Sequence, residues 1–171
     1  MACDITQGRA GGKCKDSNGG TRKLYLFNYV ENPFTVVNGE VVGISTELTT
    51  VYQFDLVGNV NPFAEELVTS RDTQTTVNTQ TITAVFGKVD ATTAAEFSAL
   101  SKGYPQGVIE DRNGIFHAVG ITEGIDFNVA STTGSAQTDL NGFTLTGTAI
   151  ESSLSPKLDE ASITAFKALI A

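Results

Sequence analysis

The chain has 171 residues, a formal net charge of −8 and 40% hydrophobic residues, so it is long enough to form one domain with its own core. Its acidity argues against a DNA-binding protein, because such proteins use Lys and Arg to neutralise phosphates. One histidine, two cysteines and no tryptophan supply few groups for acid, base, nucleophile or metal chemistry, which favours a structural protein over an enzyme.

Residues 1–21 are predicted to form a flexible N-terminal arm, because their recurrent glycines favour neither helix nor strand. Basic residues cluster in the arm and directly after it, at Arg9, Lys13, Lys15, Arg22 and Lys23. An acidic neighbour, such as a second copy of the chain, would attract this cluster. A solvated tail without a partner is the alternative interpretation.

The first residues lack the apolar stretch of a secretory signal, so we expect synthesis in the cytoplasm. No apolar run approaches the roughly 20 residues that span a bilayer, and we expect no membrane insertion.

Residues 22–171 are predicted to form a single β-rich domain. In a strand at residues 22–30, Tyr25, Phe27 and Tyr29 share one face while Leu24 and Leu26 share the other, so both faces should be covered. Further strands are predicted at residues 49–57, 65–72 and 76–89.

Threonines alternate with apolar residues in the strand at residues 76–89. Its apolar side is expected to face the core, and the other side carries Thr79, Thr81 and Thr83. Threonine suits an exposed strand face, because its branched Cβ favours extended backbone while its hydroxyl stays hydrated.

A helix is predicted at residues 91–102, with Asp90 as its N-cap and Gly103 just past its end. Strands follow at residues 107–111 and 115–121, joined by an Asn113-Gly114 turn, and at 125–130 and 143–152.

A C-terminal helix is predicted at about residues 159–170, with one apolar face that could dock on its own sheet or on a neighbouring subunit. This order of elements predicts a mainly β fold with a flanking helix (α+β), an antiparallel β-sandwich or barrel.

Two segments near the N-terminus contain residue types that are found in ligand sites. Gly8–Lys13 has the glycines of a phosphate-binding loop, but Cys14 stands where such a loop needs Ser or Thr for magnesium. Cys3 and Cys14 lack a second Cys/His pair to complete a zinc site, and a reducing cytoplasm disfavours a disulfide between them. We expect two thiols packed in the arm or in an interface, with a disulfide possible after release into an oxidising medium.

The remaining candidate residues also carry no predicted chemistry. His117 lies in an apolar strand with no nucleophile or orienting acid near it in the sequence, so we expect a strand histidine without a catalytic role. Glu65 and Glu66 should point to opposite faces of a strand, and Asp159-Glu160 should begin a helix. No catalytic, cofactor-binding or metal-ligating residue is therefore predicted.

Segments in both halves of the chain resemble a group of tailed-bacteriophage virion proteins. The N-terminal half matches their opening at Cys3–Arg9, Cys14–Ser17, Gly19-Gly20 and Tyr25–Tyr29. The C-terminal half matches at Asn113-Gly114, Gly120, Gly124, Thr133-Gly134 and Asp139–Gly142. Within this group the chain is most similar to a major tail tube protein.

This resemblance implies a β-sandwich with a flanking helix and subunits that form hexameric rings stacked into a tube. It also implies a virion location in the phage tail, contacts with other virion proteins, no cofactor, and passage of DNA without specific binding. An acidic lumen would keep the phosphates sliding, and Asp55 and Glu47 are candidate lumen residues. A loop at Gly39–Glu47 could stack onto the next ring.

Other roles stay open beside the tail tube. A head decoration protein, a head–tail connector or a tail terminator would share the composition and acidity. A carbohydrate-binding adhesion module is less favoured, because the chain has no Trp and most of its Phe and Tyr occupy alternating, core-like positions.

Overall fold

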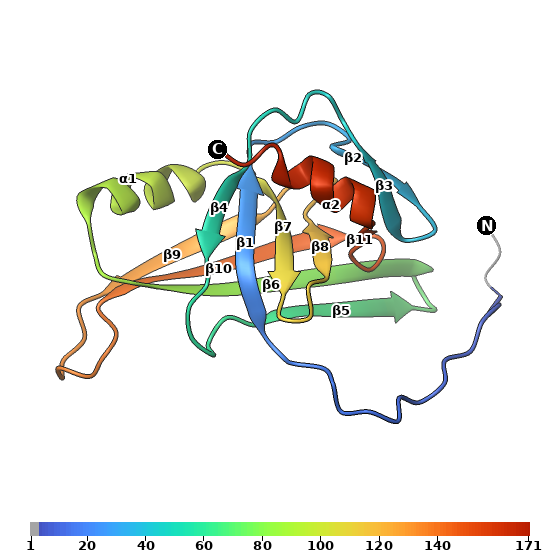
Figure 1. The fold of residues 1–171 in the computed structure, drawn as a ribbon, viewed down its shortest axis with the longest axis horizontal. Helices are drawn as coiled ribbons and strands as arrows, with labels where there is room; N and C mark the ends of the chain where they lie inside the picture. Colours follow the sequence, from blue (N-terminus) through green and yellow to red (C-terminus); the bar gives the residue numbers. More distant parts are fainter. Residues whose placement is uncertain (1–3) are drawn as a thin grey trace.

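The computed structural model describes residues 4–171, so Cys3 and any pairing with Cys14 lie outside the described residues. The described chain is mainly β, with eleven strands and two helices, and a helix near the C-terminus as expected. The strands form two sheets that lie one above the other (Figure 1).

The larger sheet has seven strands in the order β2-β3-β11-β8-β7-β1-β4. Its strands are β1 (Thr21–Phe27), β2 (Phe34–Val37), β3 (Glu40–Ile44), β4 (Tyr52–Asp55), β7 (Gln106–Asp111), β8 (Phe116–Val119) and β11 (Lys157–Leu158). The predicted hairpin of β7 and β8 is confirmed, with Gly114 at φ 81° in its turn.

The expectation of purely antiparallel sheets is wrong for this sheet. β11 lies between β8 and β3. It runs antiparallel to β8 but parallel to β3. With only two residues, β11 has no alternating pattern that the sequence could have revealed.

The smaller sheet is antiparallel throughout and has four strands in the order β5-β6-β10-β9. Its strands are β5 (Phe63–Ser70), β6 (Thr75–Gly87), β9 (Asp126–Thr132) and β10 (Gly142–Glu151). Its strands cross those of the larger sheet steeply (Figure 1), as in orthogonally packed sheets. Within residues 4–171 neither sheet closes on itself into a barrel.

The main core lies between the two sheets. β1 contributes Leu24 and Leu26, and β10 contributes Phe143 and Leu145. One end of this core is covered by α1 (Ala91–Leu100), whose Phe97 ring lies 5.3 Å from that of Phe143, centroid to centroid.

A second core lies between the larger sheet and α2 (Glu160–Lys167). Tyr25 and Phe27 of β1 pack there against Phe166 of α2, at centroid distances of 5.5 and 6.4 Å. The prediction that β1 is covered on both faces is thus confirmed as far as Phe27, but it is wrong for Tyr29, which lies past the end of the strand and is exposed. α2 docks on the sheet of its own chain.

The predicted N-cap Asp90 and the predicted helix start at Asp159-Glu160 are both confirmed, and Asp159 proves to be an N-cap as well. The Asp90 carboxylate accepts the backbone N–H of Thr93 at 2.8 Å, and that of Asp159 accepts Ser162 N–H at 2.7 Å. The predicted end of α1 at Lys102-Gly103 is wrong, because the helix already ends at Leu100 with Ser101 as its cap.

The predicted loop at Gly39–Glu47 is also wrong, because residues 40–44 form β3, paired with β2. The two strands are joined by Asn38 and Gly39, which have φ values of 52° and 80°. Two successive positive φ angles are what a tight hairpin turn of this kind requires, and Asn-Gly is the pair that best adopts them. The sequence therefore does carry a local signal for this hairpin at Asn38-Gly39.

Candidate functional surfaces

The outward face of the four-stranded sheet is lined with threonine. Residues whose side chains fill the main core alternate along β6 and β10 with residues that point away from it. The pairing of the two strands sets Thr81 opposite Thr148 and Thr83 opposite Thr146. With Thr79 and Thr144 these residues form two adjacent rows of half-exposed threonines, which we call the threonine face.

The threonine face carries no positive charge. None of the residues in β5, β6, β9 and β10 is Lys or Arg. Two carboxylates flank the threonine rows on the same side of the sheet, since Glu66 is paired with Thr79 and Asp126 with Thr148. A polyanion that approaches this face therefore meets hydroxyls and negative charge, with no cation to hold it.

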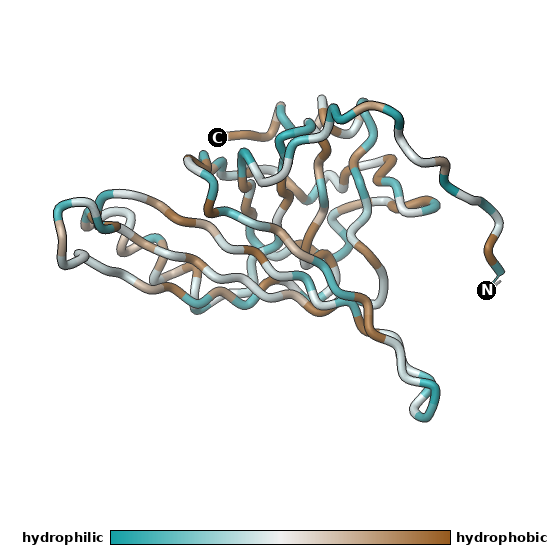
Figure 2. The backbone as a smooth tube through the Cα atoms, turned by 90° about the horizontal axis from the view of Figure 1, so that it is seen from below, coloured by the Kyte–Doolittle hydropathy of each residue, from teal (hydrophilic) through white to brown (hydrophobic). Residues whose placement is uncertain are grey.

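Among residues 4–171, both edges of the four-stranded sheet are unpaired, since β5 and β9 each have a strand on one side only. β5 and β6 continue past the body as a hairpin with a hydrophilic tip (Figure 2). Near this tip Val68 and Val77 face each other and are 55% and 39% exposed. Open edges with exposed apolar residues are suited to pairing with another chain.

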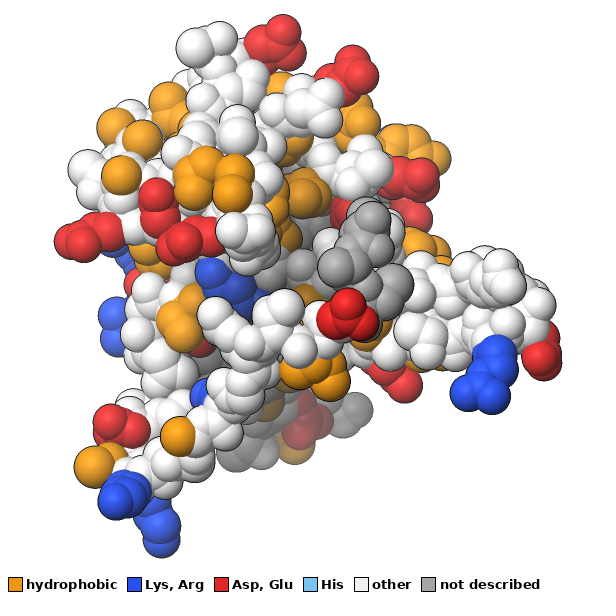
Figure 3. Space-filling model, turned by 90° about the vertical axis from the view of Figure 1, so that its right-hand side faces the viewer, with side chains coloured by type: hydrophobic (Ala, Val, Ile, Leu, Met, Phe, Trp, Pro, Cys, Tyr) orange, Lys and Arg blue, Asp and Glu red, His pale blue; other side chains and the backbone are white. Residues whose placement is uncertain are grey.

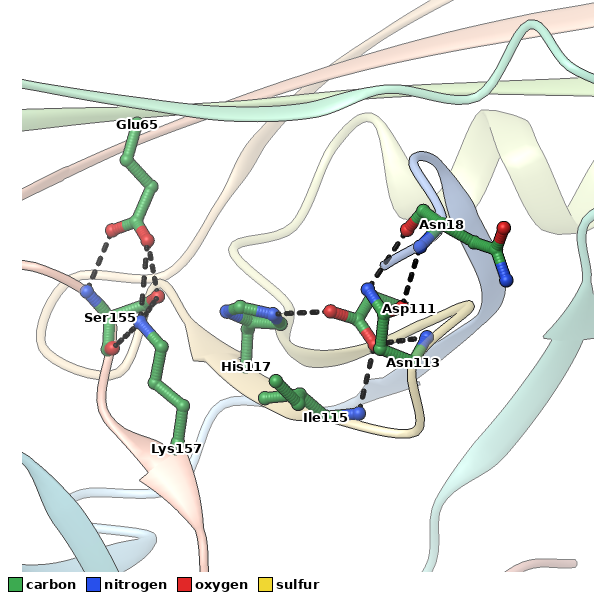
Figure 4. Close-up of polar contacts among 8 residues, drawn as sticks. All are labelled: Asn18, Glu65, Asp111, Asn113, Ile115, His117, Ser155 and Lys157. Atoms are coloured by element: carbon green, nitrogen blue, oxygen red, sulfur yellow. Dashed lines mark hydrogen bonds and ion pairs between the residues drawn. The ribbon is translucent and has the colours of Figure 1, made fainter. Parts of the chain in front are cut away.

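A polar cluster joins the two sheets near β5 (Figure 4). The half-buried Glu65 carboxylate of β5 accepts the backbone N–H and the hydroxyl of Ser155, and also the Asn78 amide at 3.0 Å. The Lys157 ammonium of β11 lies 3.7 Å from the same carboxylate. Burial raises the pKa of Glu65, but the hydrogen bonds from Ser155 and Asn78 and the charge of Lys157 outweigh it, so the pKa lies below its usual value.

His117 lies next to this cluster on β8. Its Nε2 is 3.5 Å from Asp111 Oδ2, and its ring is 5.5 Å from that of Phe63. Burial lowers the pKa of His117 and the Lys157 charge lowers it further, against the opposing effects of Asp111 and Glu65; the net shift is downward. His117 is therefore neutral at pH 7.

The cluster does not have the geometry of a nucleophile and its base. Among residues 4–171, Ser155 donates to Glu65 and accepts from Lys157, and no hydrogen bond joins it to His117. His117 Nδ1 is buried and has no partner in the described chain. The arrangement ties β5 to the larger sheet, and neither Asp111 nor Ser155 carried a sequence signal that pointed to it.

The other predicted residues lie apart from one another. Glu65 and Glu66 point to opposite faces, as expected, with only Glu66 exposed. Asp55 is exposed on the edge strand β4, where Gln53 donates to it at 2.9 Å, and Glu47 is exposed beyond β3. Asp55 is part of the larger sheet and Glu47 lies in the connection between two of its strands, so neither residue belongs to the threonine face.

The arm segments form no ligand site in the described chain. Residues 8–13 are exposed, and a Cβ added at Gly8 or Gly11 would meet nothing within 4 Å. Cys14 is exposed, so the expected packing of this thiol does not occur within the chain. Over residues 4–171, no three His, Cys, Asp or Glu side chains are grouped to hold a metal ion.

Neither helix of the described chain has the length and apolar character needed to cross a membrane. No family model matches the chain, and no curated protein or solved structure is significantly similar to it.

Proposed function

We propose that this protein is the tail tube subunit of a tailed bacteriophage, a virion protein that assembles into stacked hexameric rings. The observation that carries the proposal is the threonine face. It is broad, hydroxylated, flanked by carboxylates and free of Lys and Arg. A channel that passes DNA must not bind it. Binding requires Lys or Arg side chains that neutralise phosphates and release their counterions, and this face has none.

The fold supports the same role. Two facing sheets with a flanking helix are consistent with the β-sandwich that the resemblance to tail tube proteins implies. In a ring, β5 of one copy would lie beside β9 of the next, so that the four-stranded sheets form one continuous barrel around the lumen. Such closure also removes the open edges that would otherwise promote aggregation.

On this proposal Glu66 and Asp126 are the lumen carboxylates, in place of Asp55 and Glu47. The protein is not an enzyme and uses no cofactor; it is made in the cytoplasm of the host bacterium and joins other virion proteins in the tail.

Negative-stain electron microscopy over a concentration series tests the proposal. We expect rings or tubes with a uniform bore. Compact oligomers without a bore would favour a decoration, connector or terminator protein, and persistent monomers would favour a decoration protein or an adhesion module.

A variant tests the lumen directly. Thr146→Lys would add a cation at the centre of the threonine face, whereas Thr164→Lys adds one at an exposed position of α2. Tubes of the first variant should retain short double-stranded DNA fragments, while wild-type and Thr164→Lys tubes should not. Equal retention by the two variants would contradict the assignment of this face to the lumen.

A further inference from the structure

A groove of about 720 Å³ lies between α1 and the ends of β1 and β4. Leu26, Phe54 and Phe97 are among the apolar residues that line it. Three tyrosines also line it, although most aromatic residues of the chain are buried or half-buried: Tyr29, Tyr52 and Tyr104 are 50%, 50% and 62% exposed. We call this site the tyrosine groove.

The tyrosine groove has negative but no positive side-chain charge. Glu96 of α1 is the only charged side chain among its lining residues, and it is exposed. Tyr29 is held in place because its hydroxyl donates to the Thr122 carbonyl at 2.8 Å. Exposed aromatic rings beside a carboxylate form a site suited to the Lys or Arg of an extended segment.

The N-terminal arm has the complementary properties. Every described residue from 4 to 20 is exposed. The stretch from Ile5 to Lys15 carries Arg9, Lys13 and Lys15 and no acidic residue, on a chain whose net charge is −8. In the space-filling view of the side toward which the arm extends, basic side chains stand on the projecting parts and at a few places on the body, and acidic ones are spread over both (Figure 3).

The arm is anchored to the body at its inner end. The backbone N–H and C=O of Asn18 bond to the Asn113 side chain at 2.8 and 2.9 Å. From Asn18 toward the N-terminus the arm runs away from the start of β1 (Figure 1). The tyrosine groove lies beside the opposite end of that strand, at Leu26 and Phe27. The 14 residues of 4–17 could extend about 45 Å from this anchor.

We propose that the arm of one copy docks in the tyrosine groove of a second copy, with Lys or Arg side chains over the tyrosine rings and near Glu96. The arm and the groove are different surfaces at opposite ends of β1, and we place them in a heterologous, head-to-tail contact in which each copy gives its arm to the next. Such a contact propagates from copy to copy and closes into a ring or continues as a stack. The inference rests on the proposed function, since it names a contact that would connect tube subunits.

Disulfide trapping with the natural Cys14 tests this contact in the full chain. In a Cys3→Ser background, Ala99→Cys adds a thiol in the groove, and Ser70→Cys adds a control at another exposed position, near the β5–β6 tip. On mild oxidation we expect a ladder of disulfide-linked oligomers from the Ala99→Cys protein, which disappears with Cys14→Ser. The Ser70→Cys protein should give no such ladder.

Charge reversal adds a second test. Lys13→Glu together with Lys15→Glu should reduce the ladder roughly five- to thirtyfold, from two lost cation–aromatic contacts. Three results would each overturn the proposal: equal crosslinking at position 70, a disulfide confined to monomers at every concentration, or no crosslink at position 99. If position 99 gave no crosslink, the groove would be left to another ligand, such as a sugar.

Electron microscopy of the same samples separates this inference from the proposed function. Crosslinked oligomers without a bore would support the arm–groove contact and count against the tail tube. Tubes that form without the crosslink would support the tail tube and count against the arm–groove contact.

Discussion

Replacing Glu65 by alanine removes the link between β5 and the larger sheet. The side chain is 13% exposed, and its carboxylate accepts the Ser155 backbone N–H at 2.7 Å and the Ser155 hydroxyl. Ser155 itself is 3% exposed, so water cannot readily replace the lost acceptor. Asn78 keeps its bond to the Ser153 carbonyl at 2.8 Å, and Lys157 is 42% exposed and can be hydrated.

The loss therefore falls mainly on the two donors of Ser155. A buried donor left without a partner costs about 1–3 kcal/mol, so we expect Glu65→Ala to lower the free energy of unfolding by about 2–4 kcal/mol. For a chain of 171 residues this corresponds to a fall in Tm of roughly 5–15 °C. The difference from wild type should shrink in acid, because the lowered pKa of Glu65 means that its stabilisation is lost as pH falls through that pKa.

Urea unfolding followed by circular dichroism measures this effect at pH 7. Glu66→Ala is the matched control, since Glu66 is the next residue and is exposed on the opposite face. It should change the free energy of unfolding by no more than about 0.5 kcal/mol. If Glu65→Ala were as mild as this control, the polar cluster would not hold the sheets together.

The remaining predictions concern pH and close packing. Because the pKa of His117 in the folded chain lies below its ordinary value of 6.5, the unfolded chain takes up the proton first. Stability should therefore fall as pH drops below 6.5, and His117→Gln should flatten this slope; an unchanged slope would refute the role of His117. Gly142 of β10 is paired with Gly87 of β6. A Cβ added at Gly142 would overlap the Phe86 carbonyl, whereas a Cβ added at Gly87 would meet nothing within 4 Å. Gly142→Ala should cost about 1–3 kcal/mol in a thermal melt, while Gly87→Ala should cost much less; similar Tm values would contradict this packing.

Alternation in the sequence predicted which side chains share a face. The inward position of Ile82 and Ala84 and the outward position of Thr79, Thr81 and Thr83 follow from a period of two residues. That period does not identify the neighbouring strand. The row at Thr144–Thr148 lies beside the first row only because β10 pairs with β6, a long-range contact with no local signature.

The polar cluster was out of reach for a similar reason. Glu65 and Ser155 are separated by 90 residues, and each has an unremarkable local sequence. The β2–β3 hairpin, by contrast, has a local signature in the sequence. Asn38-Gly39 between two runs of β-branched residues is a strong turn signal. The tyrosine groove arises because Tyr29 and Tyr104 lie beyond the ends of their neighbouring elements, where strand or helix periodicity no longer predicts burial.

Whether the threonine face lines a channel can be seen in a helical reconstruction of assembled tubes by cryo-electron microscopy. We expect a bore bounded by β5, β6, β9 and β10, with β5 of each subunit paired with β9 of the next. The threonines that should face inward are Thr81, Thr83, Thr146 and Thr148. A bore lined by the seven-stranded sheet, or an assembly in which the threonine face is buried between subunits, would contradict this expectation.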